Sequence, residues 1–202
     1  SEEDRQLCAI IFRESLRLND LVTDMMDLAR PRAPSPHVVD LARIAREVRA
    51  LASHSERSAS GDVEVRFVGP DGPALAVCDP AQMKQVLWNL VRNAVQVTRA
   101  GSAVTIRVEP HDDDVLVEVE DGGPGIAAPD RARIFDAFYT TRATGAGLGL
   151  AVVKRIVEDH AQVGARIEVR SPDGAGAVFS VTLPRAAEGD RPSPLPEPTI
   201  EH

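Results

Sequence analysis

Two asparagines stand four residues apart in a segment with the pattern of a helix. The pair Asp79-Pro80 is typical of a helix start, and the helix expected over residues 80–97 places Asn89 and Asn93 on one face. An amide oxygen suits Mg²⁺, which takes few protein oxygens and completes its shell with water and phosphate. Taken alone, two exposed polar side chains are the simpler interpretation.

A carboxylate followed by glycines forms a second constellation, Asp121-Gly-Gly-Pro-Gly125. An aspartate at a strand end can accept a hydrogen bond from the exocyclic amine of adenine. The glycines would let a flat ring come close to the backbone. A glycine-rich hairpin turn explains the same residues equally well when they stand alone.

A third constellation, Gly145-Ala-Gly147-Leu-Gly149, stands directly before an expected helix over residues 150–159. Glycines at a helix N-terminus expose backbone amides and the positive end of the helix dipole, which together bind phosphate. The spacing is not that of a dinucleotide fingerprint, and the P-loop motif G-x-x-x-x-G-K-[ST] is absent from the sequence. A fourth group, Gly174-Ala-Gly176, is by itself only a turn.

The elements that must position these groups begin with a long helix over residues 4–29. Its apolar residues recur every three or four positions, which favours a helical bundle or coiled coil over a helix lying on its own domain. We expect the following organisation: a helical segment over 1–31, a proline-rich linker over 32–38, a second domain over 39–184 and a disordered tail over 185–202.

Within the second domain the pattern alternates between helices and short strands. Tight turns join most strands, which predicts antiparallel neighbours with helices on one face. The fold class is therefore an α/β two-layer sandwich with a mixed, mostly antiparallel sheet, preceded by one long helix. The expected helices are 39–54, 80–97, 131–135 and 150–159, a polar turn covers 55–61, and the expected strands are 63–68, 74–78, 102–109, 115–120, 166–170 and 177–183.

Composition excludes several classes of function. The 202 residues carry a net charge of −8, which argues against nucleic acid as a partner. No apolar run approaches the length of a membrane span, so we expect no membrane contact by this chain. The two cysteines fit neither a disulfide framework nor a zinc site, and a cytoplasmic location is expected. Because the sequence does not begin with Met, we expect it to be a piece of a longer protein.

Five motifs in a fixed order resemble the catalytic ATP-binding module of sensor histidine kinases, within the Bergerat-fold ATPase superfamily. They are QVLWNLVRNA, VEDGGPGI, IFDAFYTTR, GAGLGLAVVKRIVE and GAGAVFSVTLP, and together they span residues 85–184. Upstream, residues 14–31 are similar to the second helix of that family's dimerisation and phosphotransfer hairpin. Details of two motifs look most like the nitrogen-regulatory branch.

The resemblance implies ATP and Mg²⁺ as ligands and assigns roles to individual residues. Asn93 would ligate Mg²⁺, Asn89 would face the same pocket, and Asp121 would bind the adenine amine. Residues 139–147 would form a lid over ATP, whose Arg142 either stabilises the γ-phosphate or is an exposed lid arginine. The other implied ATP-binding residues are Gly123, Gly125, Ile126, Phe138, Thr140, Thr141, Gly145, Gly147, Leu148 and Gly149, and Phe135 and Phe138 would anchor the base of the lid.

The implied reaction transfers the γ-phosphate of ATP to a histidine on a dimerisation hairpin of a longer, homodimeric parent protein. The resemblance implies that the phosphate then passes to the receiver domain of a response regulator. None of the five histidines has the acceptor setting H-[ED]-x-x-x-P, so we expect the acceptor helix to precede Ser1 and this chain to be unable to label itself. His160 is interpreted as structural. Whether the parent is anchored in a membrane stays open.

Two alternatives are kept. One is a serine kinase of the anti-sigma type, against which the helix over 4–29 argues. The other is a non-catalytic nucleotide-binding module, against which the complete set of motifs argues. An efficient ATP hydrolase is disfavoured, because the hydrolysing relatives carry a glutamate where this chain has Asn89.

Overall fold

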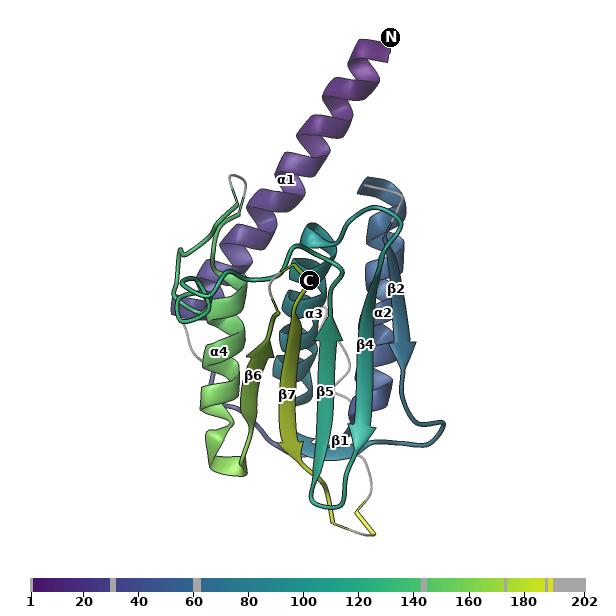
Figure 1. Cartoon of the computed structure of the whole chain (residues 1–202), viewed down its shortest axis with the longest axis vertical. Helices are drawn as coiled ribbons and strands as arrows, with labels where there is room; N and C mark the ends of the chain where they lie inside the picture. Colours follow the sequence, from purple (N-terminus) through teal and green to yellow (C-terminus); the bar gives the residue numbers. More distant parts are fainter. Residues whose placement is uncertain are drawn as a thin grey trace, which may run out of the picture.

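A five-stranded sheet carries three helices on one face (Figure 1). The computed structural model describes residues 2–29, 32–59, 63–142, 145–172, 174–187 and 189–190. The strand order is β2-β4-β5-β7-β6; β2 and β4 are parallel, and all other neighbours are antiparallel. This confirms the predicted two-layer sandwich. The strands are β2 (Glu64–Val68), β4 (Ala103–Pro110), β5 (Asp114–Glu120), β6 (Arg166–Arg170) and β7 (Val178–Pro184), and the helices are α2 (Leu41–Ala59), α3 (Pro80–Val97) and α4 (Gly149–Asp159).

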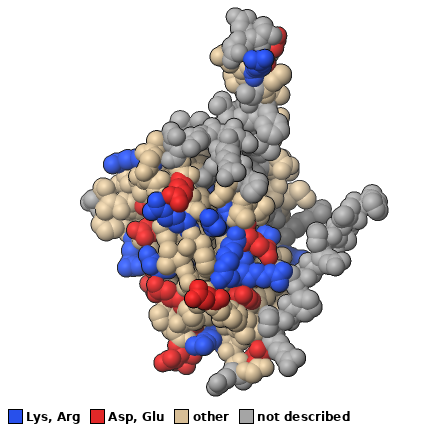
Figure 2. Space-filling model, turned by 90° about the vertical axis from the view of Figure 1, so that its right-hand side faces the viewer, with Lys and Arg blue, Asp and Glu red and all other residues tan. Residues whose placement is uncertain are grey.

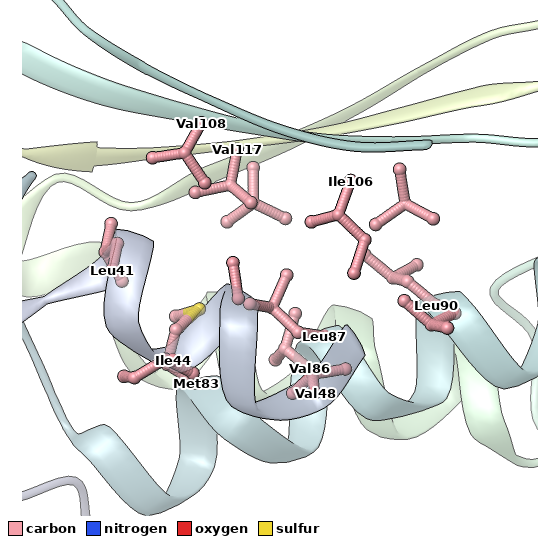
Figure 3. Packing of buried hydrophobic residues seen from close by; sticks show 14 of the residues in the cluster. Leu41, Ile44, Val48, Met83, Val86, Leu87, Leu90, Ile106, Val108 and Val117 are labelled. Atoms are coloured by element: carbon pink, nitrogen blue, oxygen red, sulfur yellow. The ribbon is translucent and has the colours of Figure 1, made fainter. Parts of the chain in front are cut away.

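The core lies between this sheet and the three helices. Alternate residues of β4 and β5 point toward the helices and are buried, whereas their neighbours face outward. Figure 3 shows Ile106, Val108 and Val117 of the sheet above Leu87 and Leu90 of α3. Burial of this apolar surface is the main source of stability. It also determines which face of α3 stays outside the core and can contact a ligand.

A buried polar junction joins the start of α3 to the end of α4. Asp79 caps α3, because its Oδ1 accepts from the backbone amides of Ala81 and Gln82 at 2.9 and 3.1 Å. Its own backbone N–H donates to His160 Nε2 at 3.0 Å. His160 is 1 % exposed, and its Nδ1 lies 2.8 Å from the carbonyl oxygen of Ile156. This agrees with a structural role for His160.

Helix α1 (Glu2–Ala29) projects beyond the sandwich, and only its C-terminal part approaches α4 (Figure 1). Arg155 Nη1 of α4 donates to the carbonyl oxygen of Leu28 at 2.8 Å, which satisfies a group at the helix end. The apolar residues Leu7, Ile11 and Leu18 are exposed. The predicted long helix is therefore confirmed, and its partner in a bundle stays a prediction.

Two predicted elements differ from the structure. The helix predicted over 39–54 begins only at Leu41, because strand β1 (His37–Asp40) precedes it and pairs with β3 (Leu75–Cys78). Asp40 Oδ1 then accepts from the backbone amide of Ala42, a helix-start signal that the apolar pattern masked. The same helix continues to Ala59. The turn predicted over 55–61 is therefore wrong for residues 55–59.

The short helix predicted over 131–135 is also absent, and residues 128–138 form successive turns instead. Most of the backbone bonds here join residues three apart, such as Arg133 N–H to the carbonyl oxygen of Asp130 at 2.8 Å. One bond of helical spacing, from Ile134 to Asp130, does not propagate because helix formation needs consecutive turns. After α4, the chain forms a 3₁₀ turn, η1 (Ala161–Val163).

Acidic and basic side chains are interspersed over the face shown in Figure 2. Arg66 Nη2 of β2 lies 2.6 Å from Glu64 Oε2, and Arg107 of β4 lies within 4.0 Å of three glutamates. None of the helices in the described part of the chain combines the length and apolar character that a membrane span requires. Most of the predicted tail, residues 191–202, lies outside the described residues.

Candidate functional site

A cavity of about 510 Å³ opens between α3, the loop after β5, the segment before α4 and the first residues of α4. This volume falls in the range of sites for cofactors and other small molecules. Most of the predicted site residues line it, although they come from three separate stretches of the chain. They are Asn89, Asn93, Asp121, Gly125, Ile126, Thr140, Thr141, Arg142, Gly145, Gly147, Leu148 and Gly149.

Two predicted site residues, Gly123 and Phe138, are not among the lining residues. The backbone amide of Gly123 donates to Asp121 Oδ1 at 2.8 Å, so this glycine holds the Asp121 side chain in place without lining the cavity. Phe138 is 68 % exposed and has a positive φ of 65°. Phe135, by contrast, packs edge-on against Phe179 of β7, with 6.3 Å between ring centroids, and its role as an anchor of the lid stays a prediction.

The polar face of α3 forms one wall. Asn89, Arg92, Asn93 and Gln96 all line the cavity, and their spacing of three or four residues places them on one stripe of the helix. The opposite stripe is buried in the core, so packing of that side aims the polar side inward. Sequence reasoning missed Arg92 and Gln96, although their helical spacing from Asn89 was a usable signal.

Asn89 is almost fully buried, with 3 % of its surface exposed. Its Oδ1 accepts from Arg92 Nη2 at 3.0 Å. Its Nδ2 is buried and has no hydrogen-bond partner among the residues that the structure describes. A buried donor without a partner is costly, and it marks a place where a ligand acceptor would be favourable.

Asp121 follows β5 and is 6 % exposed. Its Oδ1 accepts from the backbone amides of Gly123 at 2.8 Å and Ala177 at 3.2 Å, so Oδ2 remains to accept from a ligand. Burial raises the pKa of this carboxyl, and the two backbone hydrogen bonds oppose that rise only in part. Gly176 lies so close to Asp121 that a side chain there would clash with the Asp121 carbonyl oxygen.

Ser171 is a second residue that sequence reasoning missed. Its buried hydroxyl donates to the carbonyl oxygen of Gly176 at 2.8 Å and accepts from the backbone amide of Ile126 at 2.7 Å. It therefore ties the loop after Asp121 to the turn before β7. No local sequence signal indicates this role, because the bond from Ile126 joins residues 45 positions apart in the chain.

The N-terminus of α4 also lines the cavity. Helix α4 starts at Gly149, and its N-cap residue, Leu148, supplies no side-chain hydrogen bond to the first turn. The N-terminal amides and the positive end of the helix dipole are therefore left for an anion. Gly147 has a φ of +69°, and a side chain there would meet the backbone of Phe138 at 2.6 Å.

Arg142 enters the cavity from the segment predicted to be a lid. Its Nη2 donates to Asn93 Oδ1 at 2.6 Å, and its Nη1 donates to Gln96 Oε1. Burial lowers the pKa of this arginine, and the charge of Arg92 lowers it further. The side chain is half-buried and lies in the cavity, and contact with a phosphate stays a prediction. Residues 143 and 144 of the predicted lid lie outside the described residues.

A single protein oxygen, Asn93 Oδ1, is the predicted ligand for Mg²⁺. The described residues contain no group of three or more His, Cys, Asp or Glu that could hold a metal by themselves. The donor set nevertheless fits Mg²⁺, which uses one or two protein oxygens when phosphates and waters supply the rest. Asn93 lines the cavity beside the N-terminus of α4, where phosphates would complete that shell.

Comparison with known proteins decides the family. Residues 78–187 match the family described as histidine kinase-, DNA gyrase B-, and HSP90-like ATPase. The chain belongs to this family. Its ATPase domain is of the sensor histidine kinase type, since the similar proteins are sensor kinases. Sensor histidine kinase ZraS of Escherichia coli is 35 % identical over 182 residues, which are 90 % of this chain and 38 % of that protein.

Solved structures agree with this family. The catalytic domain of histidine kinase ThkA superposes with a TM-score of 0.65 at 28 % identity, covering 75 % of this chain and 98 % of that one. Full-length ShkA in complex with AMPPNP gives a TM-score of 0.73 at 31 % identity, covering 93 % of this chain and 40 % of that one. ThkA in complex with the response regulator protein TrrA gives 0.71 at 28 % identity, over 88 % of this chain and 50 % of that chain.

The chain spans about two fifths of the length of the first curated relatives that it matches, 38 % in the case of ZraS. These relatives are named as histidine kinases, which disfavours the serine-kinase and non-catalytic alternatives. The nitrogen-regulatory branch stays a prediction.

Proposed function

We propose that this chain binds ATP with Mg²⁺ and delivers the γ-phosphate to a histidine of a dimerisation hairpin. The observation that carries the proposal is the meeting of three groups in one cavity: a buried carboxylate at Asp121, the polar stripe of α3, and an N-terminus of α4 without a side-chain cap. The first suits an adenine amine, and the other two suit phosphates.

Each wall has a distinct task. Asp121 Oδ2 accepts from the adenine amine and would face the carbonyl oxygen of guanine, so two acceptors would be opposed and GTP would bind weakly. The amides of α4 and Asn89 Nδ2 donate to phosphate oxygens. Arg142 adds a positive charge on the lid side. Phosphoryl transfer needs mainly positioning and charge neutralisation, which these groups supply.

Asn93 Oδ1 would hold Mg²⁺, which when bound would neutralise negative charge on the phosphates. In the structure this oxygen accepts from Arg142, so binding of the metal requires that guanidinium to move toward the phosphates. At position 89 the side chain is a carboxamide, which cannot take a proton from water as a carboxylate can. The site therefore favours transfer to an acceptor over hydrolysis.

The acceptor and the partners form the rest of the proposal. None of the five histidines stands in the setting H-[ED]-x-x-x-P, so the phosphate goes to a histidine of a hairpin outside residues 1–202 or on a partner. Helix α1 serves as part of that hairpin, and a response regulator receiver domain then takes the phosphate. The two free cysteines agree with a cytoplasmic location.

Titration calorimetry with ATP, with and without Mg²⁺, tests the metal and nucleotide site. We expect Asn93→Ala to lower ATP affinity about tenfold when Mg²⁺ is present and to leave metal-free binding unchanged, because one charge-assisted ligand contact is lost. Alanine favours helix, so α3 should persist. Gln85→Ala, which removes an amide from the same helix outside the cavity, is the matched control and should bind like the wild type. Equal Mg²⁺-linked binding by Asn93→Ala would remove Asn93 from the site.

A further inference from the structure

Arg92 lines the cavity, but the sequence motifs assign it no role. It lies on α3 between the two asparagines, is half-buried and lines the cavity. Its Nη2 donates to Asn89 Oδ1 at 3.0 Å. The same Nη2 lies 3.3 Å from the point where a side chain on Gly149 would begin, so it stands at the first residue of α4.

Positive charge therefore converges on one part of the cavity from three directions. The N-terminus of α4 carries a positive partial charge, and Arg92 stands beside it. Arg142 approaches from the lid side, and the charge of Arg92 is one cause of its lowered pKa. These three sources repel one another, so their closeness favours an anion between them.

The acidic residues that line the cavity are engaged elsewhere. Asp121 accepts from two backbone amides at the adenine end, and Asp130 accepts from the hydroxyl of Tyr139.

Arg92 also determines how the Asn89 amide is oriented. Because Asn89 Oδ1 accepts from Arg92, Nδ2 must point the other way, where it is buried without a partner in the described part of the chain. The arginine thus holds a buried donor in the direction where a ligand oxygen would satisfy it. This observation is independent of the charges and indicates the same anion.

We propose that Arg92 is a phosphate-binding residue, whose guanidinium contacts the triphosphate beside the N-terminus of α4 and orients Asn89 to donate to the same phosphates. The inference rests on the proposed function, because it takes the anion to be the triphosphate of ATP. It adds a second arginine, on the rigid α3 side, to the lid arginine Arg142. A planar guanidinium suits this double contact because it presents several donors in fixed directions.

Titration calorimetry on the whole chain with ATP and with adenosine tests this assignment. We expect Arg92→Gln to weaken ATP binding about 30-fold, the loss of a charge-assisted contact, and to leave adenosine binding unchanged. The wild type should also lose ATP affinity with rising salt more steeply than Arg92→Gln does. Arg99→Gln removes the same charge from an exposed position beyond α3 and should bind both ligands like the wild type.

The outcomes separate the two proposals. If the wild type binds ATP and Arg92→Gln binds it equally well, Arg92 does not contact phosphate, while the proposed function stands. Equal losses for ATP and adenosine would show that Arg92 only supports the fold. A wild type that binds no ATP would overturn the proposed function and this inference together.

Arg92→Lys covers the case in which Arg92→Gln fails to fold, as checked by thermal melting. Its ammonium keeps the charge but cannot hold the Asn89 amide and a phosphate at once. We expect ATP affinity about fivefold lower, with adenosine unchanged. Wild-type ATP affinity in this variant would contradict the double contact.

Discussion

Replacing Asp121 by asparagine should separate ligand binding from stability. The change keeps Oδ1, which accepts from Gly123 and Ala177, and exchanges Oδ2 for an amide that can only donate. The amide would oppose the adenine amine, so a hydrogen bond to a charged acceptor is lost and two donors face each other. Together these effects cost about 3 kcal/mol, or about 100-fold in ATP affinity.

The stability of the free protein should move in the opposite direction. Burial raises the pKa of Asp121 above its value in the unfolded chain, so the folded state binds this proton more tightly. At neutral pH the ionised carboxylate therefore lowers stability, and its contribution improves as pH falls through the raised pKa. Asp121→Asn removes that charge, so its free energy of unfolding at neutral pH should equal or exceed that of the wild type.

Calorimetry with ATP and GTP at neutral pH, together with thermal melting, measures both effects. We expect weaker ATP binding, a smaller preference for ATP over GTP, and an unchanged or higher melting temperature. Glu120→Gln, which removes the exposed neighbouring carboxylate, should bind ATP like the wild type. Unaltered ATP affinity in Asp121→Asn, or a large loss of stability with it, would refute the assignment of Asp121 to adenine.

Three further predictions follow from particular side chains. Limited trypsin cleavage after Arg142 should slow when ATP and Mg²⁺ are added, because phosphate contacts would order this segment; a rate independent of nucleotide would contradict its lid role. His160→Ala should lower the free energy of unfolding by about 3 kcal/mol and the melting temperature by about 9 °C, because it leaves a cavity and unpaired buried groups, whereas the exposed His111→Ala should change neither. Thiol titration of the folded chain at pH 8 should detect the exposed Cys8 but not Cys78, because burial raises the Cys78 pKa to about 12; two reactive thiols before denaturation would contradict this.

Local patterns predicted the elements whose signals are strong and contiguous. Helix α3 was predicted with its observed bounds, because Asp79-Pro80 announces its start and its apolar stripe is regular. The strands of the sheet were predicted to within one residue at each end. Strand β1 was missed because Val38 and Val39 also fit the helical pattern that follows, and its partner β3 lies more than thirty residues away.

In the candidate site, too, some residues were predicted from the sequence and others were not. Asn93, Asp121 and the glycines before α4 were predicted because ordered motifs contain them. Arg92 lies in one of these motifs, but the motif assigned it no role; Ser171 was missed because its bond from Ile126 joins distant segments of the chain. The bond of Arg92 to Asn89 is local, but its place beside the N-terminus of α4 exists only after α3 and α4 have come together.

Transfer of phosphate to histidine is the central claim, and it can be measured directly. The chain is incubated with ATP labelled at the γ-phosphate, alone and with a separate hairpin fragment that carries a histidine in the setting H-[ED]-x-x-x-P. The proposed function predicts no label on the chain alone and weak, acid-labile label on the hairpin histidine, since the reaction without a tether is bimolecular. Label on a histidine of the isolated chain, label on serine of the hairpin, or no transfer by a chain that binds ATP would contradict it.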